Sequence, residues 1–291
     1  MGLFSRFFGK KTEAKQMDSS IVPNPDIDSA ASLSIVFKGE LNIDNDKLLT
    51  KLKSIDPTIK DIRYEIPYGQ LEAGICILVS WGKHIIRIIG LNAPYPKDVL
   101  ELCVAPASYS QEIKQQVYES DSHLLLYYVG YDQDVLEQYL ALTRLAACFE
   151  QFNALAVINE SAHTSLPVSA IHGMATEKDG LTTLGECLPI LFCGFVKYEI
   201  ENTKGIWMRT YGAHIFGLPN FAALANSYEE SGYYFDMFNN ILNYLRQSQA
   251  TMKPGDTMEM GDNRMMSLRA PQDDEYFLKD KGDLLVIEIN N

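Results

Sequence analysis

Alternating and periodic apolar positions divide most of the chain after residue 32 into strands and helices. Residues 32–39 alternate as a half-buried strand, and residues 122–130 form a continuous apolar run of the kind found inside a sheet. Residues 132–152 carry the strongest helical stripe. Its apolar members are Val135, Leu136, Tyr139, Leu142, Leu145, Ala146 and Phe149. The pattern predicts helices stacked on a sheet.

Weaker patterns predict the remaining helices and strands of the first 185 residues. Residues 42–56 predict a helix begun by an Asn or Asp cap, and the segments 61–67, 74–82, 84–94 and 153–161 predict strands, with a tight hairpin at Gly82-Lys83. The segment 96–120 is helical on both sides of Pro106, which predicts either one kinked helix or two helices. Between residues 161 and 186 the pattern loosens around three glycines, and we expect a subdomain boundary near residue 185.

The second part begins with residues 189–202 and 204–216, which predict an antiparallel pair of strands that turns at 203–205. Residues 218–250 predict one or two helices that start at Pro219, and short strands follow to the end. The fold class is therefore α+β, with two packed α/β-sandwich subdomains and mixed, largely antiparallel sheets. We expect a basic arm and linker over 1–31, a subdomain over 32–185 and a second subdomain over 186–291.

Charge narrows the choice of partner. The formal net charge is −13, but residues 1–16 hold four basic residues against Glu13 alone, a local +3, so the remainder carries −16. An acidic body repels phosphate backbones and attracts basic surfaces, which argues against nucleic acid and favours a basic protein partner. The aromatic and basic residues of 1–11 also allow a weak peripheral contact with a membrane, with a frayed terminus as the plainer interpretation.

Cysteine usage indicates the compartment. The five cysteines, an odd number, lie in apolar runs at irregular spacing, and no Cys-x-x-Cys occurs. This favours a reducing environment and argues against a disulfide framework or a zinc site, so we expect a cytoplasmic protein. Residues 1–11 lack the apolar core of a secretory signal.

Three segments resemble a known family. They are residues 94–130, residues 134–160, and RTYGAHIFGLPNF at 209–221 with PGDTMEMGD at 254–262. Together they resemble the bacterial domain-of-unknown-function family 4261 over residues 33–270. The resemblance implies a bacterial cytosolic protein and supplies no catalytic residues. A looser similarity, by analogy, connects the chain to suppressor-of-fused-like immunity proteins.

Two groups of residues are candidates for binding. Arg209, Tyr211 and His214 could converge on a cleft for an anion or carboxylate if a bulge at Gly212 brings them together, although a turn-specifying, partly buried structural element is the plainer interpretation. The acidic residues Asp256, Glu259 and Asp262 lie in turn contexts and could receive a basic partner, or could be solvated turn residues.

The helix expected after residue 228 is crowded with aromatic residues. Phe235 and Phe238 fit a core stripe, whereas Tyr234 and Tyr244 could lie outside it as interface anchors.

Known catalytic motifs are missing from the sequence. It has no G-x-S-x-G, no G-x-x-x-x-G-K-[ST], no G-x-G-x-x-G and no H-E-x-x-H, and His163 and His172 lack metal-ligand spacing. We therefore expect no catalytic residue, cofactor or metal. The sequence favours a non-enzymatic protein-binding protein, and the most specific version of this hypothesis is an immunity or toxin-neutralising protein. A small-ligand binder or enzyme near Arg209, Tyr211 and His214, and a membrane-associated factor acting through residues 1–11, are the alternatives.

Overall fold

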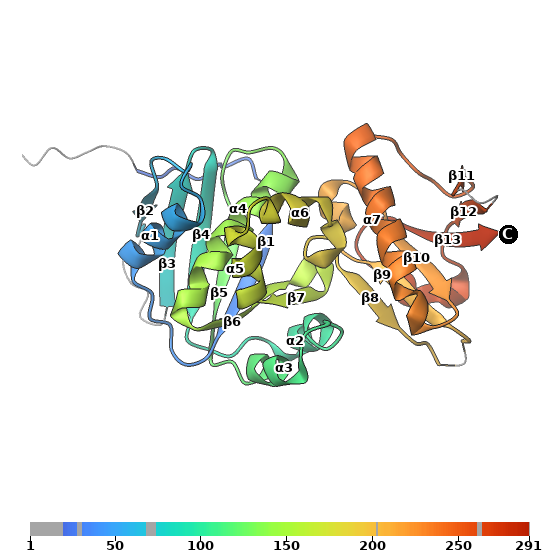
Figure 1. Cartoon of the computed structure of the whole chain (residues 1–291), viewed down its shortest axis with the longest axis horizontal. Helices are drawn as coiled ribbons and strands as arrows, with labels where there is room; N and C mark the ends of the chain where they lie inside the picture. The colour runs from blue at the N-terminus through green and yellow to red at the C-terminus, as the bar shows by residue number, and fades with distance from the viewer. Residues whose placement is uncertain (1–19, 28–30, 68–73, 202, 261–263, 291) are drawn as a thin grey trace, which may run out of the picture.

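Two β-sheets lie side by side along the long axis of the molecule (Figure 1). The structure is a computed structural model that describes residues 20–27, 31–67, 74–201, 203–260 and 264–290. The first sheet runs in the order β2-β3-β4-β5-β1-β6-β7, and its described pairings are antiparallel. Its strands are β1 (Ser32–Phe37), β2 (Arg63–Glu65), β3 (Gly74–Trp81), β4 (His84–Leu91), β5 (Ser122–Tyr128), β6 (Ala154–Asn159) and β7 (Thr164–Pro167).

Helices cover both faces of the first sheet, because its central strand β1 is apolar on both sides. Leu33, Ile35 and Phe37 point to the face that holds α1 (Asn45–Ile55), α4 (Val135–Ala147) and α5 (Val168–Thr176). Val36 points to the opposite face, against α2 (Lys97–Cys103) and α3 (Gln111–Tyr118). The cap expected for α1 is present, since the side chain of Asp44 accepts a backbone N–H at its start, and Asp134 caps α4 in the same way.

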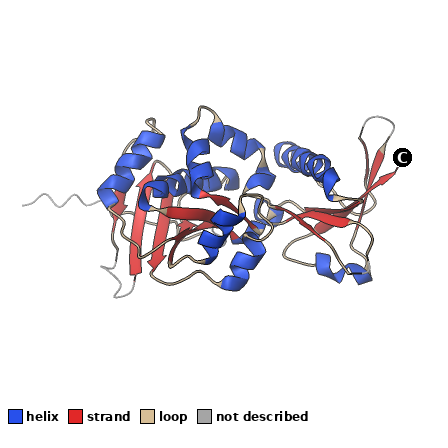
Figure 2. Cartoon of the chain, turned by 60° about the horizontal axis from the view of Figure 1, so that its bottom comes forward, coloured by secondary structure: helices blue, strands red, loops and turns tan. Residues whose placement is uncertain are grey.

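The second sheet runs in the order β11-β12-β13-β10-β9-β8. Its strands are β8 (Phe195–Tyr198), β9 (Ile206–Thr210), β10 (Asn220–Ala225), β11 (Thr257–Glu259), β12 (Met265–Arg269) and β13 (Leu284–Asn290). β10 and β13 pair in parallel, and the other described pairings are antiparallel. The long helix α7 (Ser231–Ser248) covers one face, and the 3-10 helix η6 (Asp273–Leu278) covers the other, as Figure 2 shows from a second side. The α+β class with two sheets is thus confirmed.

Short 3-10 helices connect these elements. They are η1 (Cys148–Phe152), η2 (Glu160–Ala162), η3 (Leu188–Ile190), η4 (Ala213–Phe216) and η5 (Tyr228–Glu230). The segment around Pro106 forms two separate helices, α2 and α3, rather than one kinked helix. Residues 1–16, the basic arm, lie outside the described residues.

The loose pattern predicted for residues 161–186 was wrong. This segment holds β7, α5 and α6 (Gly180–Glu186). Ile171 of α5 is fully buried and packs in the same core as α4, so tertiary contacts stabilise a helix that contains Gly173 in its interior. Gly180 marks close packing at the start of α6 rather than a loop, since a Cβ there would collide with the backbone of Met174.

The helix predicted to start at Pro219 was also wrong at its beginning. Residues 220–225 form strand β10, and the helix starts only at Ser231. Phe221 and Ala223 turn to the α7 side and are buried in the common core. The parallel partner of β10 is β13, about sixty positions later in the chain, so the local pattern carried no sign of that pairing.

One core joins the two sheets. A single cluster of buried residues runs from Ile35 in β1 to Ile287 in β13. Tyr139 of α4 stacks between Phe192 and Phe216, with ring centroids 5.1 and 5.7 Å away. The predicted boundary between two domains at residues 185 and 186 stays a prediction. The last strand of the first sheet ends at Pro167, and the first strand of the second sheet begins at Phe195.

Close backbone approach defines the boundary between the sheets, called the seam below and formed by residues 161–163 against residues 192–194 and 211–213. The N–H of Tyr211 donates to the carbonyl of Gly194 over 2.9 Å. A Cβ at Gly194 would overlap the carbonyl oxygen of Ala162, and one at Gly212 would lie 2.9 Å from the carbonyl oxygen of Ser161. Gly212 also has a φ of 85°, a region that favours glycine.

Gly194→Ala should destabilise the protein by about 1–3 kcal/mol, because a methyl group there meets rigid backbone. Gly173→Ala is the matched control, since a Cβ at that helical position meets nothing within 4 Å and alanine is the better helix former. Denaturant unfolding of both variants measures the difference. Equal stability of the two variants would show that the seam is not closely packed.

Candidate functional site

A groove opens in the second sheet where its parallel pair of strands separates. The rungs between β10 and β13 run from Asn220–Leu284 to Ala223–Ile287. Beyond them, β10 continues to Ala225 along β9, and β13 continues to Asn290 along β12. The two strands therefore diverge at their carboxyl ends, a position at which open sheets commonly bind ligands.

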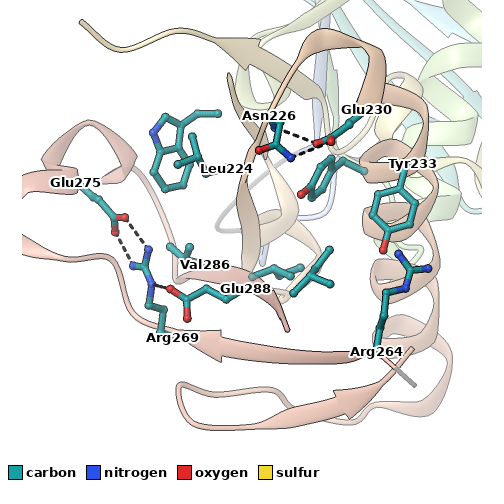
Figure 3. Close-up of a pocket in the computed structure, with 13 residues that line it drawn as sticks. Leu224, Asn226, Glu230, Tyr233, Arg264, Arg269, Glu275, Val286 and Glu288 are labelled. Atoms are coloured by element: carbon teal, nitrogen blue, oxygen red, sulfur yellow. Dashed lines mark hydrogen bonds and ion pairs between the residues drawn. The ribbon is translucent and has the colours of Figure 1, made fainter. Parts of the chain in front are cut away.

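The groove has a volume of about 560 Å³. Its apolar lining comes from Trp207, Leu224, Val286, Ile287 and Ile289. Its polar lining comes from Asn226, Glu230, Tyr233, Tyr234, Arg264, Arg269, Glu275 and Glu288. Figure 3 shows Glu275, Arg269 and Glu288 on one side, and Glu230, Tyr233 and Arg264 on the other. An apolar floor with polar walls is typical of recognition sites.

Arg269 organises one wall of the groove. Its guanidinium donates from Nη1 and Nη2 to the two carboxylate oxygens of Glu275 over 2.7 Å each, and from Nε to Glu288 over 2.6 Å. The bidentate contact lowers the pKa of Glu275 and raises that of Arg269. Two carboxylates face one guanidinium, so this wall keeps a net negative charge.

The opposite wall is built at the start of α7. The carboxylate of Glu230 accepts the backbone N–H and the side-chain amide of Asn226, both over 3.0 Å, and these hydrogen bonds lower the pKa of Glu230. The guanidinium of Arg264 lies 5.6 Å from the ring centre of Tyr233. Among the described residues, Arg264 forms no ion pair.

Large apolar side chains are exposed around this groove. They are Leu224, Tyr228, Tyr233, Met265 and Tyr276, of which Tyr276 is 71% exposed. Tyrosine, methionine and arginine are enriched at protein interfaces, where a few such side chains dominate binding. By contrast Tyr234, which the sequence allowed outside the core, is buried, whereas Tyr244 is exposed as expected.

The predicted residues Arg209 and Tyr211 meet at the seam rather than at this groove. The guanidinium of Arg209 lies 3.8 Å from the ring centre of Tyr211 and donates to the carbonyl of Leu278 over 3.1 Å. Arg209 is only 1% exposed. It lies between the sheet and η6, where the apolar run IWMRT of β9 gives it a buried position on the side of Trp207.

His163 reaches the same cluster from the first sheet, a contact that the sequence did not show. Its ring stacks on Tyr211 with centroids 4.0 Å apart. Burial lowers the pKa of His163, and the charge of Asp280 opposes this shift. Burial also raises the pKa of Tyr211 to about 12. The contact joins the two sheets, and burial favours the neutral imidazole there.

His214 lies in η4, between β9 and β10, and its side chain lies against the turn that precedes β13. A Cβ at Gly282 would overlap its side chain, and burial lowers its pKa while Asp280 opposes the shift. The charge of Asp280 thus acts on Tyr211 and His214, two of the three predicted residues, as well as on His163, and Gly212, where a bulge was expected, has a left-handed backbone just before η4. None of them lines the groove. Their role in binding stays a prediction.

The predicted acidic turns lie at the other edge of the second sheet. The carboxylate of Asp256 accepts the N–H of Lys253 over 2.9 Å and so closes the turn before β11. Glu259 is exposed at the end of that edge strand. Asp262 lies outside the described residues. Asp256 and Glu259 do not line the groove, and the binding role of all three acidic residues stays a prediction.

The sequence analysis missed the residues of the groove walls. A charged residue inside an apolar strand was a usable signal for Glu288, which interrupts the run LLVIEIN. No signal placed it beside Arg269, because that contact depends on the register between β12 and β13. The described residues contain no group of three or more His, Cys, Asp or Glu side chains placed to hold a metal ion.

Within the described part of the chain, no helix has the length and apolar character needed to cross a membrane. The structure defines an α+β protein whose two sheets share one core and whose second sheet ends in a polar-walled groove.

Comparison with known proteins identifies the second half. The family model for DUF4261, a domain of unknown function, matches residues 209–288. The match supports the resemblance predicted from residues 209–221, while residues 33–208, over which the resemblance was also expected, lie outside it. No curated protein and no solved structure matches the chain significantly. The matched segment runs from the end of β9 into β13 and so contains most of the groove lining.

Acid should weaken the seam. Because the pKa of His163 in the folded protein lies below its ordinary value of 6.5, the unfolded chain binds this proton more readily, so stability falls as the pH drops through that value. His163→Asn, which tolerates the left-handed φ of 47°, should lose less stability between about pH 7 and pH 5 than the parent protein does. Unfolding free energies at the two pH values measure this.

Asp280→Asn should instead increase the loss of stability between about pH 7 and pH 5. The reason is that Asp280 raises the pKa of His163 and of His214, so its removal lets both values fall further. An unchanged pH dependence in both variants would contradict the assignment.

Proposed function

We propose that this protein is a non-enzymatic protein-binding protein that receives a basic segment of another protein in the groove between β10 and β13. The observation that carries the proposal is the exposure of large apolar side chains at the groove: Leu224 and Tyr233 line it, and Tyr228 and Met265 are close in sequence to lining residues. Such a surface gains free energy when a partner covers it.

Charge favours a basic partner. Around the groove, Glu230, Glu275 and Glu288 stand against Arg264 and Arg269, and the exposed Asp273 and Asp274 extend the acidic side along η6. The whole chain carries −13. Complementary charge speeds association and selects the partner more than it adds affinity.

A toxin-neutralising or immunity role is the most specific form of this proposal, and the net charge of −13 supports it. A cytoplasmic location belongs to the proposal too, since all five cysteines are free thiols. The alternative of a small-ligand site or enzyme at Arg209 has less support, because that guanidinium is buried and stacked on Tyr211. The membrane alternative rests on residues 1–11, which lie outside the described residues.

Electrostatic attraction to the acidic residues of η6 should contribute to binding of the partner. A pull-down from the source cells followed by mass spectrometry identifies it, and the purified pair is then measured by calorimetry at low and high salt. Asp273→Lys with Asp274→Lys should weaken binding by about tenfold and reduce its salt dependence, since rim charges contribute about 0.2–1 kcal/mol each.

The matched control places the same charge change on the first subdomain, at the exposed Glu112 and Glu177. This control should bind as the parent protein does. The proposal would be contradicted if both double variants lost the same binding affinity, or if the affinity of the parent protein did not depend on salt concentration.

A further inference from the structure

The gap between β10 and β13 exposes backbone groups as well as side chains. On β10, the N–H of Asn220 donates to Asp283, just before β13, whereas the N–H of Phe221 donates to Thr210 of β9. Backbone groups alternate in direction along a strand, so those of Leu224 face β13.

The same alternation orients β13. The hydroxyl of Ser267, on β12, lies 3.5 Å from the carbonyl oxygen of Glu288, so the backbone groups of Glu288 face β12. Those of the next residue, Ile289, therefore face β10. Among the described residues, however, β10 and β13 form no rung beyond Ala223–Ile287. The carbonyl of Leu224 and the N–H of Ile289 thus face the gap without a rung between them.

An open strand edge is a template for another chain. Here the edge lies inside a groove, with apolar side chains below it and carboxylates beside it. Main-chain hydrogen bonds give affinity in strand addition, and the flanking side chains give specificity.

We propose that the partner enters as an extended segment that adds to β13 at Ile289, with a basic side chain directed to the carboxylates of the groove walls. This inference rests on the proposed function and adds to it the conformation of the bound segment. β13 continues for three residues past the last rung, 288–290, so the paired part is short, about 10 Å.

The charge of the walls specifies the basic residue. Glu275 and Glu288 share Arg269, so their wall keeps one negative charge, and Glu230 adds another on the far side. Arg264 supplies the opposing charge and lies beside Tyr233. The exposed Asp273, Asp274 and Glu229 extend the acidic surroundings. A lysine or arginine flanked by apolar residues matches this arrangement.

Two variants at one position separate backbone from side-chain binding. Ile289→Pro removes the N–H that faces the gap, and proline is tolerated there because that N–H is not part of the ladder to β12. Ile289→Ala removes most of the same side chain and keeps the N–H. The probe is a random dodecapeptide library displayed on phage, selected on the full chain, and the enriched peptides are then synthesised for anisotropy measurements.

Enriched peptides should contain lysine or arginine between apolar residues. They should bind the Ile289→Pro variant at least about tenfold more weakly than the Ile289→Ala variant, because both lose most of the isoleucine side chain and only the proline variant loses the N–H. A second measurement needs no protein variant: N-methylation of single peptide amides should weaken binding at alternate positions only. Three results would overturn the inference. The selected peptides could be acidic, their affinity could be unaffected by N-methylation, or the same peptides could be enriched equally on the Ile289→Pro variant.

The partner found by pull-down distinguishes this inference from the proposed function. If it binds both Ile289 variants equally but is lost on charge reversal at Asp273 and Asp274, the groove is an interface and strand addition is wrong. If none of these changes affects its binding, both the inference and the proposed function at this groove are wrong.

Discussion

The close approach of backbone at the seam is the constraint on which the rest of the molecule depends. Gly194 and Gly212 let residues 192–194 and 211–213 lie directly on residues 161–163, with no side chain between them. Tyr139 then stacks between Phe192 and Phe216, and His163 stacks on Tyr211. These contacts fix the second sheet against the first and make one core of two layers. The glycines and the aromatic residues act together, because the rings can stack only if the backbones come this close.

The seam also explains why the most recognisable segment of the chain is not its groove. Arg209, Tyr211 and His214 lie where β9 turns back toward the first sheet, and Arg209 is buried. Its guanidinium stacks on Tyr211 and donates to the carbonyl of Leu278, while its buried Nη2 has no hydrogen-bond partner among the described residues. The arrangement serves the packing of the sheets, while the exposed apolar and acidic side chains gather at the other end of β10 and β13.

The groove follows from the topology of the second sheet. The parallel strands β10 and β13 each have an antiparallel neighbour on their other side. Past their last shared rung the two strands separate, because β10 runs toward the start of α7 whereas β13 continues along β12. The separation of the two strands exposes Leu224 and Ile289, and the ion pairs of Arg269 stiffen one side. Recognition at this groove would therefore use a rigid sheet rather than a mobile loop.

The sequence by itself determined the α+β class, the strands and helices with strong periodicity, the hairpin at Gly82-Lys83 and the acidic charge, because these depend on neighbours in the chain. It also identified residues 209–221 as a family signature. Only the tertiary structure decided that residues 220–225 form a strand, that residues 161–186 fold into β7, α5 and α6, and that Glu288 faces Arg269. The physical reason is that pairing and register between distant strands, and burial against helices remote in sequence, outweigh local preference in each of these segments.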